Sequence, residues 1–145
     1  MKKAIFLAII DKKKKYLLLI RRNDNTSGFP GGYIENNEKK LEALKREVLE
    51  EINFDIEKYL NNLEEVKTTS KNIFLFTLFL DIKDIIEIMT KSPYAKHFAS
   101  EILGIELLKL ERENIQNILN QKENGNFREQ ILTLIKKYNI PVKYK

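Results

Sequence analysis

Residues 28–54 read GFPGGYIENNEKKLEALKREVLEEINF, and this stretch decides the fold. Its first five residues predict a stiff corner, because two adjacent glycines, Gly31 and Gly32, free the backbone to adopt positive φ and to approach a ligand closely. The polar residues 21–27 before the corner are expected to form a loop. The chain is therefore predicted to turn sharply immediately before its main helix.

That helix is predicted over residues 38–52. Asn36 or Asn37 can cap it, and Glu38 then lies in the first turn, where the helix dipole favours an anion. Apolar residues recur at helical spacing and predict its buried stripe, which consists of Leu41, Leu44, Val48 and Ile52.

Three carboxylates lie on one face of this predicted helix. Glu47, Glu50 and Glu51 fall within about 100° of arc, because a helix advances about 100° per residue. They repel one another, so a purely structural helix gains nothing from them. A divalent cation reverses that balance, since Mg²⁺ and Mn²⁺ bind carboxylate, carbonyl and water oxygens. The glycine corner can add a backbone carbonyl, and Arg46 can orient a carboxylate through its planar guanidinium.

Such a site points to phosphate chemistry. The cation would bridge pyrophosphate oxygens and make a bound water more acidic, and a nearby carboxylate would act as general base. The alternative is a solvated, charged helix face, which Glu50 and Glu51 alone would favour. The glycine corner and the Arg46–Glu47 pair shift the balance towards the metal site.

The remaining chain predicts a mixture of strands and helices. Residues 4–10 and 16–20 are expected to form a hairpin around a solvated turn at 11–15. Residues 73–80 predict an interior strand with core residues Phe74, Phe76 and Phe79, and residues 102–110 predict another strand. Amphipathic helices are expected at 111–119 and 127–138, separated by a polar turn at 124–126. Residues 83–100 show no clear pattern, and their second half is interpreted as a long loop.

Length and composition restrict the class of protein. A chain of 145 residues fits one domain, here residues 1–145, and 43% hydrophobic with 32% charged residues is typical of a soluble globular protein. The net charge of +5 favours phosphate-bearing partners. The chain contains no cysteine, which excludes disulfides and zinc–thiolate sites and fits a cytoplasmic protein. The apolar run that ends at Ile10 is too short to span a membrane, so no membrane partner is expected.

The central stretch resembles the Nudix box, Gly-x5-Glu-x7-Arg-Glu-U-x-Glu-Glu-x-Gly-U, where U is a bulky apolar residue. The residues at matching spacing are Gly32, Glu38, Arg46, Glu47, Val48, Glu50, Glu51 and Phe54. One position departs from the box, because Asn53 stands where the family has glycine. That glycine ends the helix in the left-handed conformation, and asparagine is the next-best residue there.

The resemblance implies an α/β (α+β) Nudix fold, in which a mixed sheet lies between helices. It also implies a cofactor, Mg²⁺ or Mn²⁺, held by Glu47, Glu50 and Glu51 with a carbonyl from Gly31 or Gly32. The catalytic residues it implies are Glu50, Glu51 and Arg46.

A more distant resemblance connects the chain to the small-nucleolar-RNA-decapping and inosine-diphosphatase branch of the Nudix family. It rests on Arg22 with residues 28–32, on Ala95-Lys96 with residues 101–104, and on residues 128–130. It implies that Arg22 and Phe29 touch the nucleotide, that Glu101 is a further catalytic carboxylate near the metals, and that Gln130 contacts the base. The branch also uses a histidine on its first strand, where this sequence is taken to have Lys3, which argues against a hypoxanthine preference.

Ordinary structural roles compete with several of these assignments. Phe29 is equally well interpreted as a core residue, and Gln130 or Glu101 as a solvated surface residue. His97 is interpreted as a loop residue without a catalytic role. Residues 12–15, all lysine, are expected to be a solvated turn, with an RNA-backbone contact as the alternative.

The expected function is metal-dependent hydrolysis of a phosphoanhydride bond in a nucleoside diphosphate linked to a group X. Within this class, (deoxy)inosine-type nucleotides or capped RNA are favoured, so the partner is a nucleotide or an RNA 5′ end. The alternative is a housecleaning hydrolase of oxidised nucleotides or ADP-ribose. A non-catalytic Nudix-fold RNA-binding module is a remote alternative, because all carboxylates of the box are intact. A homodimer is left open.

Overall fold

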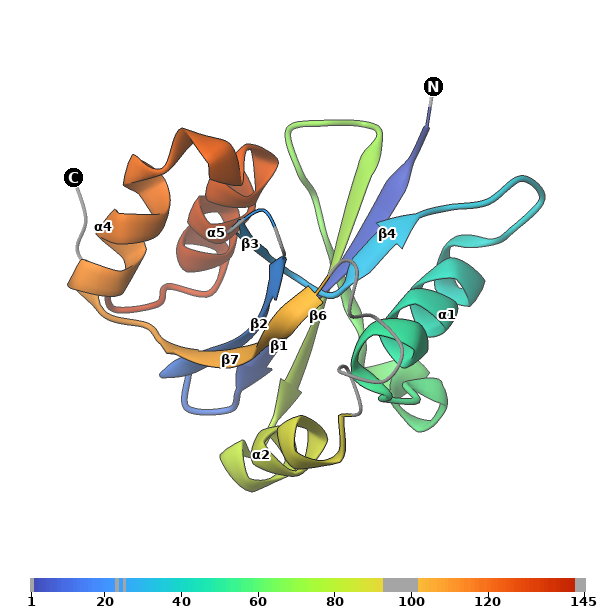
Figure 1. Cartoon of the computed structure of the whole chain (residues 1–145), viewed down its shortest axis with the longest axis horizontal. Helices are drawn as coiled ribbons and strands as arrows, with labels where there is room; N and C mark the ends of the chain where they lie inside the picture. The colour runs from blue at the N-terminus through green and yellow to red at the C-terminus, as the bar shows by residue number, and fades with distance from the viewer. Residues whose placement is uncertain (1, 23, 25, 93–101, 143–145) are drawn as a thin grey trace.

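The computed structural model describes residues 2–22, 24, 26–92 and 102–142 of the chain (Figure 1). Within these residues, seven strands form one mixed sheet with the order β3-β2-β1-β6-β5, while β4 pairs with β1 and β7 pairs with β2. The only parallel pair among the described strands joins β1 to β6. The strand bounds are β1 Ala4–Asp11, β2 Tyr16–Arg22, β3 Ser27–Gly28, β4 Gly31–Tyr33, β5 Glu64–Val66, β6 Ile73–Leu80 and β7 Ile102–Lys109.

Helices cover both faces of the sheet, and Figure 1 shows α1 and α2 on one side and α4 and α5 on the other. The helix bounds are α1 Lys40–Ile52, α2 Ile82–Lys91, α4 Arg112–Asn120 and α5 Asn126–Lys137, with short 3₁₀ helices η1 Glu57–Asn62 and η2 Lys122–Asn124. This arrangement confirms the predicted fold class. Among the described residues, no helix has both the length and the apolar character needed to cross a bilayer.

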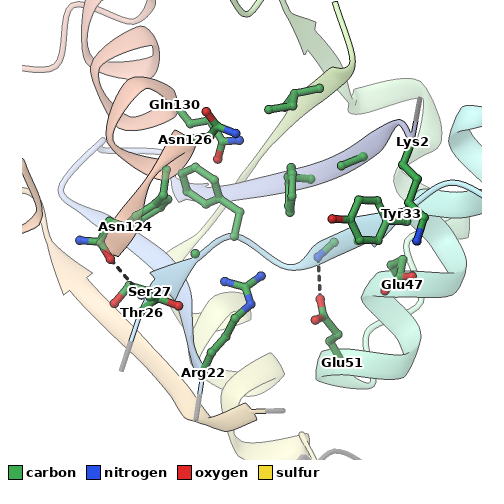
Figure 2. Close-up of a pocket in the computed structure, with 18 of the residues that line it drawn as sticks. Lys2, Arg22, Thr26, Ser27, Tyr33, Glu47, Glu51, Asn124, Asn126 and Gln130 are labelled. Carbon is green, nitrogen blue, oxygen red and sulfur yellow. Dashed lines mark hydrogen bonds between the residues drawn. The ribbon is translucent and has the colours of Figure 1, made fainter. Parts of the chain in front are cut away.

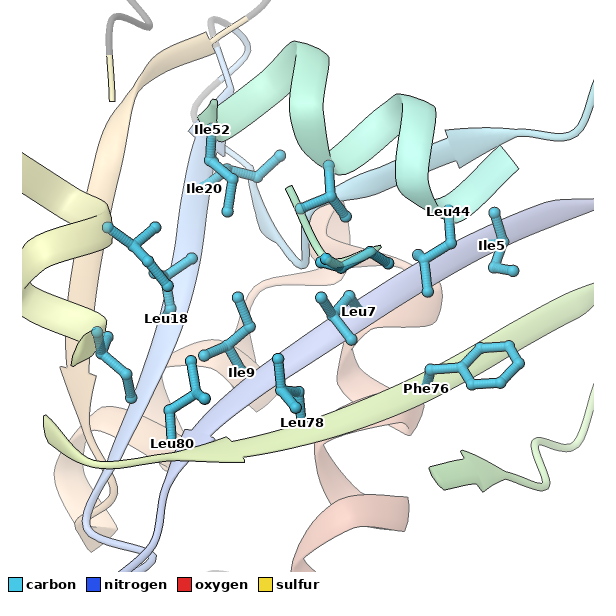
Figure 3. Close-up of a cluster of buried hydrophobic side chains, with 14 of the residues drawn as sticks. Ile5, Leu7, Ile9, Leu18, Ile20, Leu44, Ile52, Phe76, Leu78 and Leu80 are labelled. Atoms are coloured by element: carbon cyan, nitrogen blue, oxygen red, sulfur yellow. The ribbon is translucent and has the colours of Figure 1, made fainter. Parts of the chain in front are cut away.

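The central strand β1 separates two hydrophobic cores. Its side chains alternate between the two faces of the sheet, so Ile5, Leu7 and Ile9 join one core while Ala8 and Ile10 join the other. Figure 3 shows the first core, in which β1 and β6 pack against Leu44 and Ile52 of α1. The second core lies beneath α4 and α5. Because β1 is covered on both faces, its sequence is an almost continuous apolar run.

The predicted hairpin of β1 and β2 is confirmed, but its turn is not fully solvated. Asp11 is buried and accepts hydrogen bonds from the backbone N–H groups of Lys13, Lys15 and Tyr16, at 3.1, 2.7 and 2.7 Å. A buried carboxylate with three donors is satisfied, and it fixes the turn. Residues 21–27 are also more regular than expected, because their ends belong to β2 and β3.

The main helix differs from the prediction at its start. It begins after Lys39, whose N–H is accepted by the Glu42 carboxylate at 2.9 Å, so neither Asn36 nor Asn37 is the cap. Asn37 instead adopts a positive φ of 66° in the preceding turn. Leu41 was wrongly placed in the buried stripe, since it is 38% exposed, and Ala43 takes its place.

The end of α1 agrees with the sequence. Asn53 adopts the left-handed conformation with φ 55° and donates its N–H to the Leu49 carbonyl at 3.0 Å. Residues 82–91, which carried no clear pattern, form α2, whereas the predicted loop after them lies outside the described residues.

Candidate active site

A cavity of about 850 Å³ opens at the edge of the sheet where β4 separates from β3. Its wall brings together residues far apart in the sequence, from β1, β4, α1, η2 and α5. Figure 2 shows Glu47 and Glu51 at one end and Asn126 and Gln130 at the other, with Arg22 reaching in between them. The cavity therefore has an acidic end and an end rich in carboxamides.

The acidic end is built by α1 against the glycine corner. Glu51 is only 8% exposed, and its carboxylate accepts the Gly31 N–H at 2.6 Å. The Glu47 carboxyl lies so close to Gly32 that a Cβ there would stand 2.6 Å from the Glu47 Cδ. Both carboxylates and both glycine backbones line the same cavity. The corner was predicted as a place of close approach, and the partners it approaches are these two glutamates.

Arg46 fixes the Glu38 and Glu47 side chains through hydrogen bonds. Its Nε and Nη2 donate to the Glu38 carboxylate at 2.8 and 3.0 Å, and its Nη1 donates to Glu47 at 2.8 Å. A further bond joins Nη2 to the Tyr33 carbonyl at 3.1 Å. The hydrogen bonds from Arg46 lower the pKa of Glu38 to about 2, and they raise the pKa of Arg46 itself. Arg46 thus orients the Glu47 carboxylate, because a planar guanidinium donates hydrogen bonds in fixed directions.

Glu50 lies outside this cavity. It is mostly exposed, with 54% of its side chain accessible, and it approaches Arg46 Nη1 at 3.6 Å from the outer side of α1. Among the described residues, no three acidic or histidine side chains already converge as a metal shell. The donors that do converge are Glu47, Glu51 and the backbone of Gly31 and Gly32. These are all hard oxygen donors, and they fit Mg²⁺ or Mn²⁺.

The carboxamide end lies under α5. Gln130 is 6% exposed and lines the cavity, so it is not a solvated surface residue. Asn124 and Asn126 line the same end, and neither was singled out from the sequence. Phe29 is completely buried and packs edge-on against Phe127, with 5.0 Å between ring centroids. The core interpretation of Phe29 is therefore correct, although the residue also forms part of the cavity wall.

The first strand presents a different residue from the one expected. Lys2, Ala4 and Phe6 line the cavity, because alternate residues of a strand share a face. Lys3 is exposed and does not line the cavity, so the residue expected to stand in the place of the branch's histidine does not reach the candidate site. Phe6 is the aromatic residue that β1 contributes to the cavity wall, and the period-2 pattern of β1 was the signal that could have found it.

Two predicted residues cannot be placed. Glu101 and His97 lie outside the described residues, so Glu101 stays a prediction. Arg22 is at the end of β2 and lines the cavity as expected.

Solved structures share the fold of this chain. A protein from Deinococcus radiodurans matches with a TM-score of 0.59 and 18% identity, covering 94% of this chain and 82% of that one. An Ap4A hydrolase from C. elegans matches with a TM-score of 0.54 and 17% identity, covering 93% and 99%. At these identities the likeness concerns the fold alone. Together with the box residues on α1, it defines a Nudix hydrolase.

A family model described as "Nudt16-like: U8 snoRNA-decapping enzyme-like" matches residues 1–141. The chain belongs to this Nudt16-like family. A Homalodisca vitripennis protein named U8 snoRNA-decapping enzyme is 33% identical over 94 residues, covering 61% of this chain and 50% of that protein. The chain thus spans about half the length of the curated relative it matches.

Proposed function

We propose that the protein hydrolyses a phosphoanhydride bond within a nucleoside diphosphate linked to a group X, with Mg²⁺ or Mn²⁺ as cofactor. The observation that carries this proposal is the pairing of Glu47 and Glu51 with the Gly31–Gly32 backbone around one cavity. Two carboxylates held within a few ångströms of a glycine bend suit a hard cation and the phosphate oxygens beside it. The family to which the chain belongs supports the same chemistry.

The proposed ligands are Glu47 and Glu51, with a carbonyl from Gly31 or Gly32. Glu50 would join them as the third carboxylate of the box only if its side chain turned from the outer side of α1 towards the cavity. When bound, the cation would supply charge neutralisation at the phosphate oxygens and a more acidic water. Arg46 keeps Glu47 in place, and the Gly31 N–H keeps Glu51 in place. A carboxylate of Glu50, Glu51 or Glu101 would accept the proton from the attacking water.

The opposite end of the cavity is suited to a nucleobase. Asn126 and Gln130 each offer one acceptor and two donors, which can pair with the edge of a base, and Phe6 offers an aromatic face. Arg22 lies between the two ends, where the phosphates of a nucleotide would pass. Phe29, which is completely buried, forms part of the cavity wall behind these residues.

Within this class we favour (deoxy)inosine-type nucleotides or the capped 5′ end of an RNA. The name of the Homalodisca vitripennis relative supports the RNA. Oxidised nucleotides and ADP-ribose are the second candidate, because the carboxamides can also pair with the edge of a modified base.

The complete carboxylate set and the family match favour an enzyme over an RNA-binding module without catalysis. A cytoplasmic location stays a prediction of the cysteine-free composition, and a homodimer is still open.

A substrate panel tests the proposal. Phosphate and pyrophosphate release is measured for inosine, guanosine and oxidised-guanosine phosphates, ADP-ribose and capped RNA, with Mg²⁺ and Mn²⁺ separately. Release should require the cation and stop when a chelator is added. Release that persists in chelator would contradict the proposed metal chemistry.

The Glu51→Gln variant tests the site itself. Glutamine keeps an oxygen that can accept the Gly31 N–H, so the fold and its melting temperature should change little. The variant loses an anionic metal ligand, and turnover should fall by at least about 100-fold. Lys40→Gln, on the same helix but outside the cavity, serves as the control. Near-wild-type turnover in Glu51→Gln would show that the site is misplaced.

A further inference from the structure

Arg22 is directed into the cavity by the local geometry of two strands. It is the last residue of β2, and its pairing with β7 is irregular, because Arg21 pairs with Gly104 whereas Arg22 pairs with Ile102. The extra residue lies on β7, so the regular pairing of the two strands ends beside Arg22. The Arg22 side chain lies against Gly28 of β3 and reaches the cavity between its two ends.

The guanidinium of Arg22 lies directly against Gly28. A Cβ placed on Gly28 would collide with Arg22 Nη1 and would stand 3.2 Å from its Cζ and 3.3 Å from its Nη2. These three atoms are the nearest neighbours that the Cβ would meet, and all belong to the flexible end of one side chain. Gly28 has no positive φ, so its backbone alone would accept alanine. The missing side chain at residue 28 leaves room for this guanidinium.

We propose that Gly28 is a positioning residue for substrate binding, and that it places the Arg22 guanidinium where it binds a phosphate oxygen of the nucleotide. This inference rests on the proposed function for the class of ligand. The guanidinium meets the Gly28 backbone with its Nη1 and Nη2 edge, so its Nε and Nη2 edge is left to face a ligand, and that edge can make a bidentate contact with phosphate. The acidic end of the cavity makes such a cation necessary, because Glu47 and Glu51 would otherwise repel an anionic substrate.

The strand that carries Gly28 is fixed in place by the C-terminal layer. The N–H of Ser27 donates to Asn124 Oδ1 at 3.2 Å, and Asn124, which is buried, donates in turn to the Ile118 carbonyl at 3.0 Å. The loop between β2 and β3 is closed by the Arg22 N–H, which donates to the Thr26 carbonyl at 2.9 Å. These bonds hold the backbone on each side of the contact between Gly28 and Arg22, so a methyl group on Gly28 is accommodated when the Arg22 side chain moves.

A double-mutant cycle tests this assignment. Wild type, Gly28→Ala, Arg22→Ala and the double variant are compared by calorimetric binding of inosine 5′-diphosphate in chelator, and by KM and kcat for its hydrolysis with Mn²⁺. Arg22→Ala should weaken binding about 10- to 100-fold, the range of a charge-assisted hydrogen bond. Gly28→Ala should weaken it by a similar factor, with kcat changed much less than KM. In the Arg22→Ala background, Gly28→Ala should have no further effect.

Stability measurements separate positioning from misfolding. The melting temperature of Gly28→Ala should stay near that of the wild type, because only a flexible side chain must move. Leu78→Ala is the control, since Leu78 is buried in the first core and does not line the cavity. That variant should melt lower while its KM is unchanged.

The possible results distinguish this inference from the proposed function. Equal binding by wild type and Gly28→Ala, or additive effects of the two substitutions, would overturn the positioning role even if turnover is normal. Binding that follows the expected cycle without any hydrolysis would support the positioning role and contradict the proposed function. A wild type that does not bind the nucleotide would overturn both.

Discussion

At the scale of single residues, the three glycines of residues 28–32 are required for three different reasons. Gly28 leaves room for the Arg22 guanidinium, and Gly32 leaves room for the Glu47 carboxyl. Gly31 has a φ of 151°, and its Cβ would stand 2.7 Å from the Phe6 Cα and would also meet the Ile5 carbonyl. The first two contacts involve side-chain ends, whereas the third involves backbone, so the same substitution should have different consequences.

Alanine substitutions at Gly31 and Gly32 test this difference. Gly32→Ala should displace the Glu47 carboxyl and weaken Mn²⁺ binding by about 10- to 100-fold, while the free energy of unfolding changes by less than about 1 kcal/mol. Gly31→Ala should lower the free energy of unfolding by about 2 kcal/mol or more, because it combines backbone overlap with an unfavourable φ. Metal titration calorimetry and urea unfolding measure the two effects. Wild-type Mn²⁺ affinity in Gly32→Ala would refute the assignment of Glu47.

Phe6 lines the cavity, and we expect its ring to stack on the nucleobase. Phe6→Leu keeps an apolar side chain but removes the ring, and base–aromatic stacking is worth about 1–3 kcal/mol per base. We expect KM for inosine 5′-diphosphate to rise by about 5- to 100-fold, with kcat nearly unchanged. Phe79→Leu is the control, because Phe79 packs against Tyr138 and does not line the cavity. If both variants keep the wild-type KM, the base does not rest on Phe6.

At the scale of elements, the C-terminal helix is tied to the sheet by one tyrosine. Tyr138, directly after α5, shares a hydrogen bond of 2.6 Å with Thr77 of β6 and donates to the Glu64 carboxylate of β5. Burial, together with the hydrogen bond to Glu64, raises the pKa of Tyr138 to about 12. This tie holds α5 over the sheet, and α5 carries Gln130 and Asn126 into the cavity.

Tyr138→Phe should lower the free energy of unfolding by about 1 kcal/mol at pH 8, the usual value of a lost hydrogen bond. Because the folded-state pKa of Tyr138 lies above the ordinary value of 10, its contribution is complete below about pH 10 and is lost as the pH rises through about 12. The stability difference between wild type and Tyr138→Phe should therefore narrow between pH 10 and 12. Urea unfolding at pH 8, 10 and 11.5 measures it. A difference that grows with pH would contradict this account.

The elements themselves were largely readable from the sequence. The interior strand β6, the end of α1 at Asn53 and both C-terminal helices follow from apolar periodicity and capping chemistry, which are local. The start of α1 was misread because Glu42 satisfies the Lys39 N–H, and an asparagine cap was therefore not required. Leu41 follows the helical period of the stripe, but it lies in the first turn of α1 and stays 38% exposed, because periodicity alone does not say how much of a helix is covered.

At the scale of the whole molecule, the candidate active site is formed by segments that are distant in the sequence. The acidic end comes from α1 and β4, and the carboxamide end comes from η2 and α5, about eighty residues later in the chain. The central strand β1 supports both ends, because its two faces join two separate cores. The cavity is thus a product of how α1 and α5 are placed on opposite faces of one twisted sheet.

The sequence by itself determined which residues could meet at the acidic end, because Glu47, Glu51 and Arg46 lie close together on one helix and the glycine corner precedes that helix directly. Helix geometry grouped Glu50 with them, whereas the structure leaves Glu50 outside the cavity. Only the tertiary structure decided what faces that end across the cavity. The choice of Phe6 over Lys3 depends on which face of β1 points towards the cavity, and the places of Asn126 and Gln130 depend on packing between α5 and the sheet. Local periodicity defines a surface, but long-range packing decides what that surface meets.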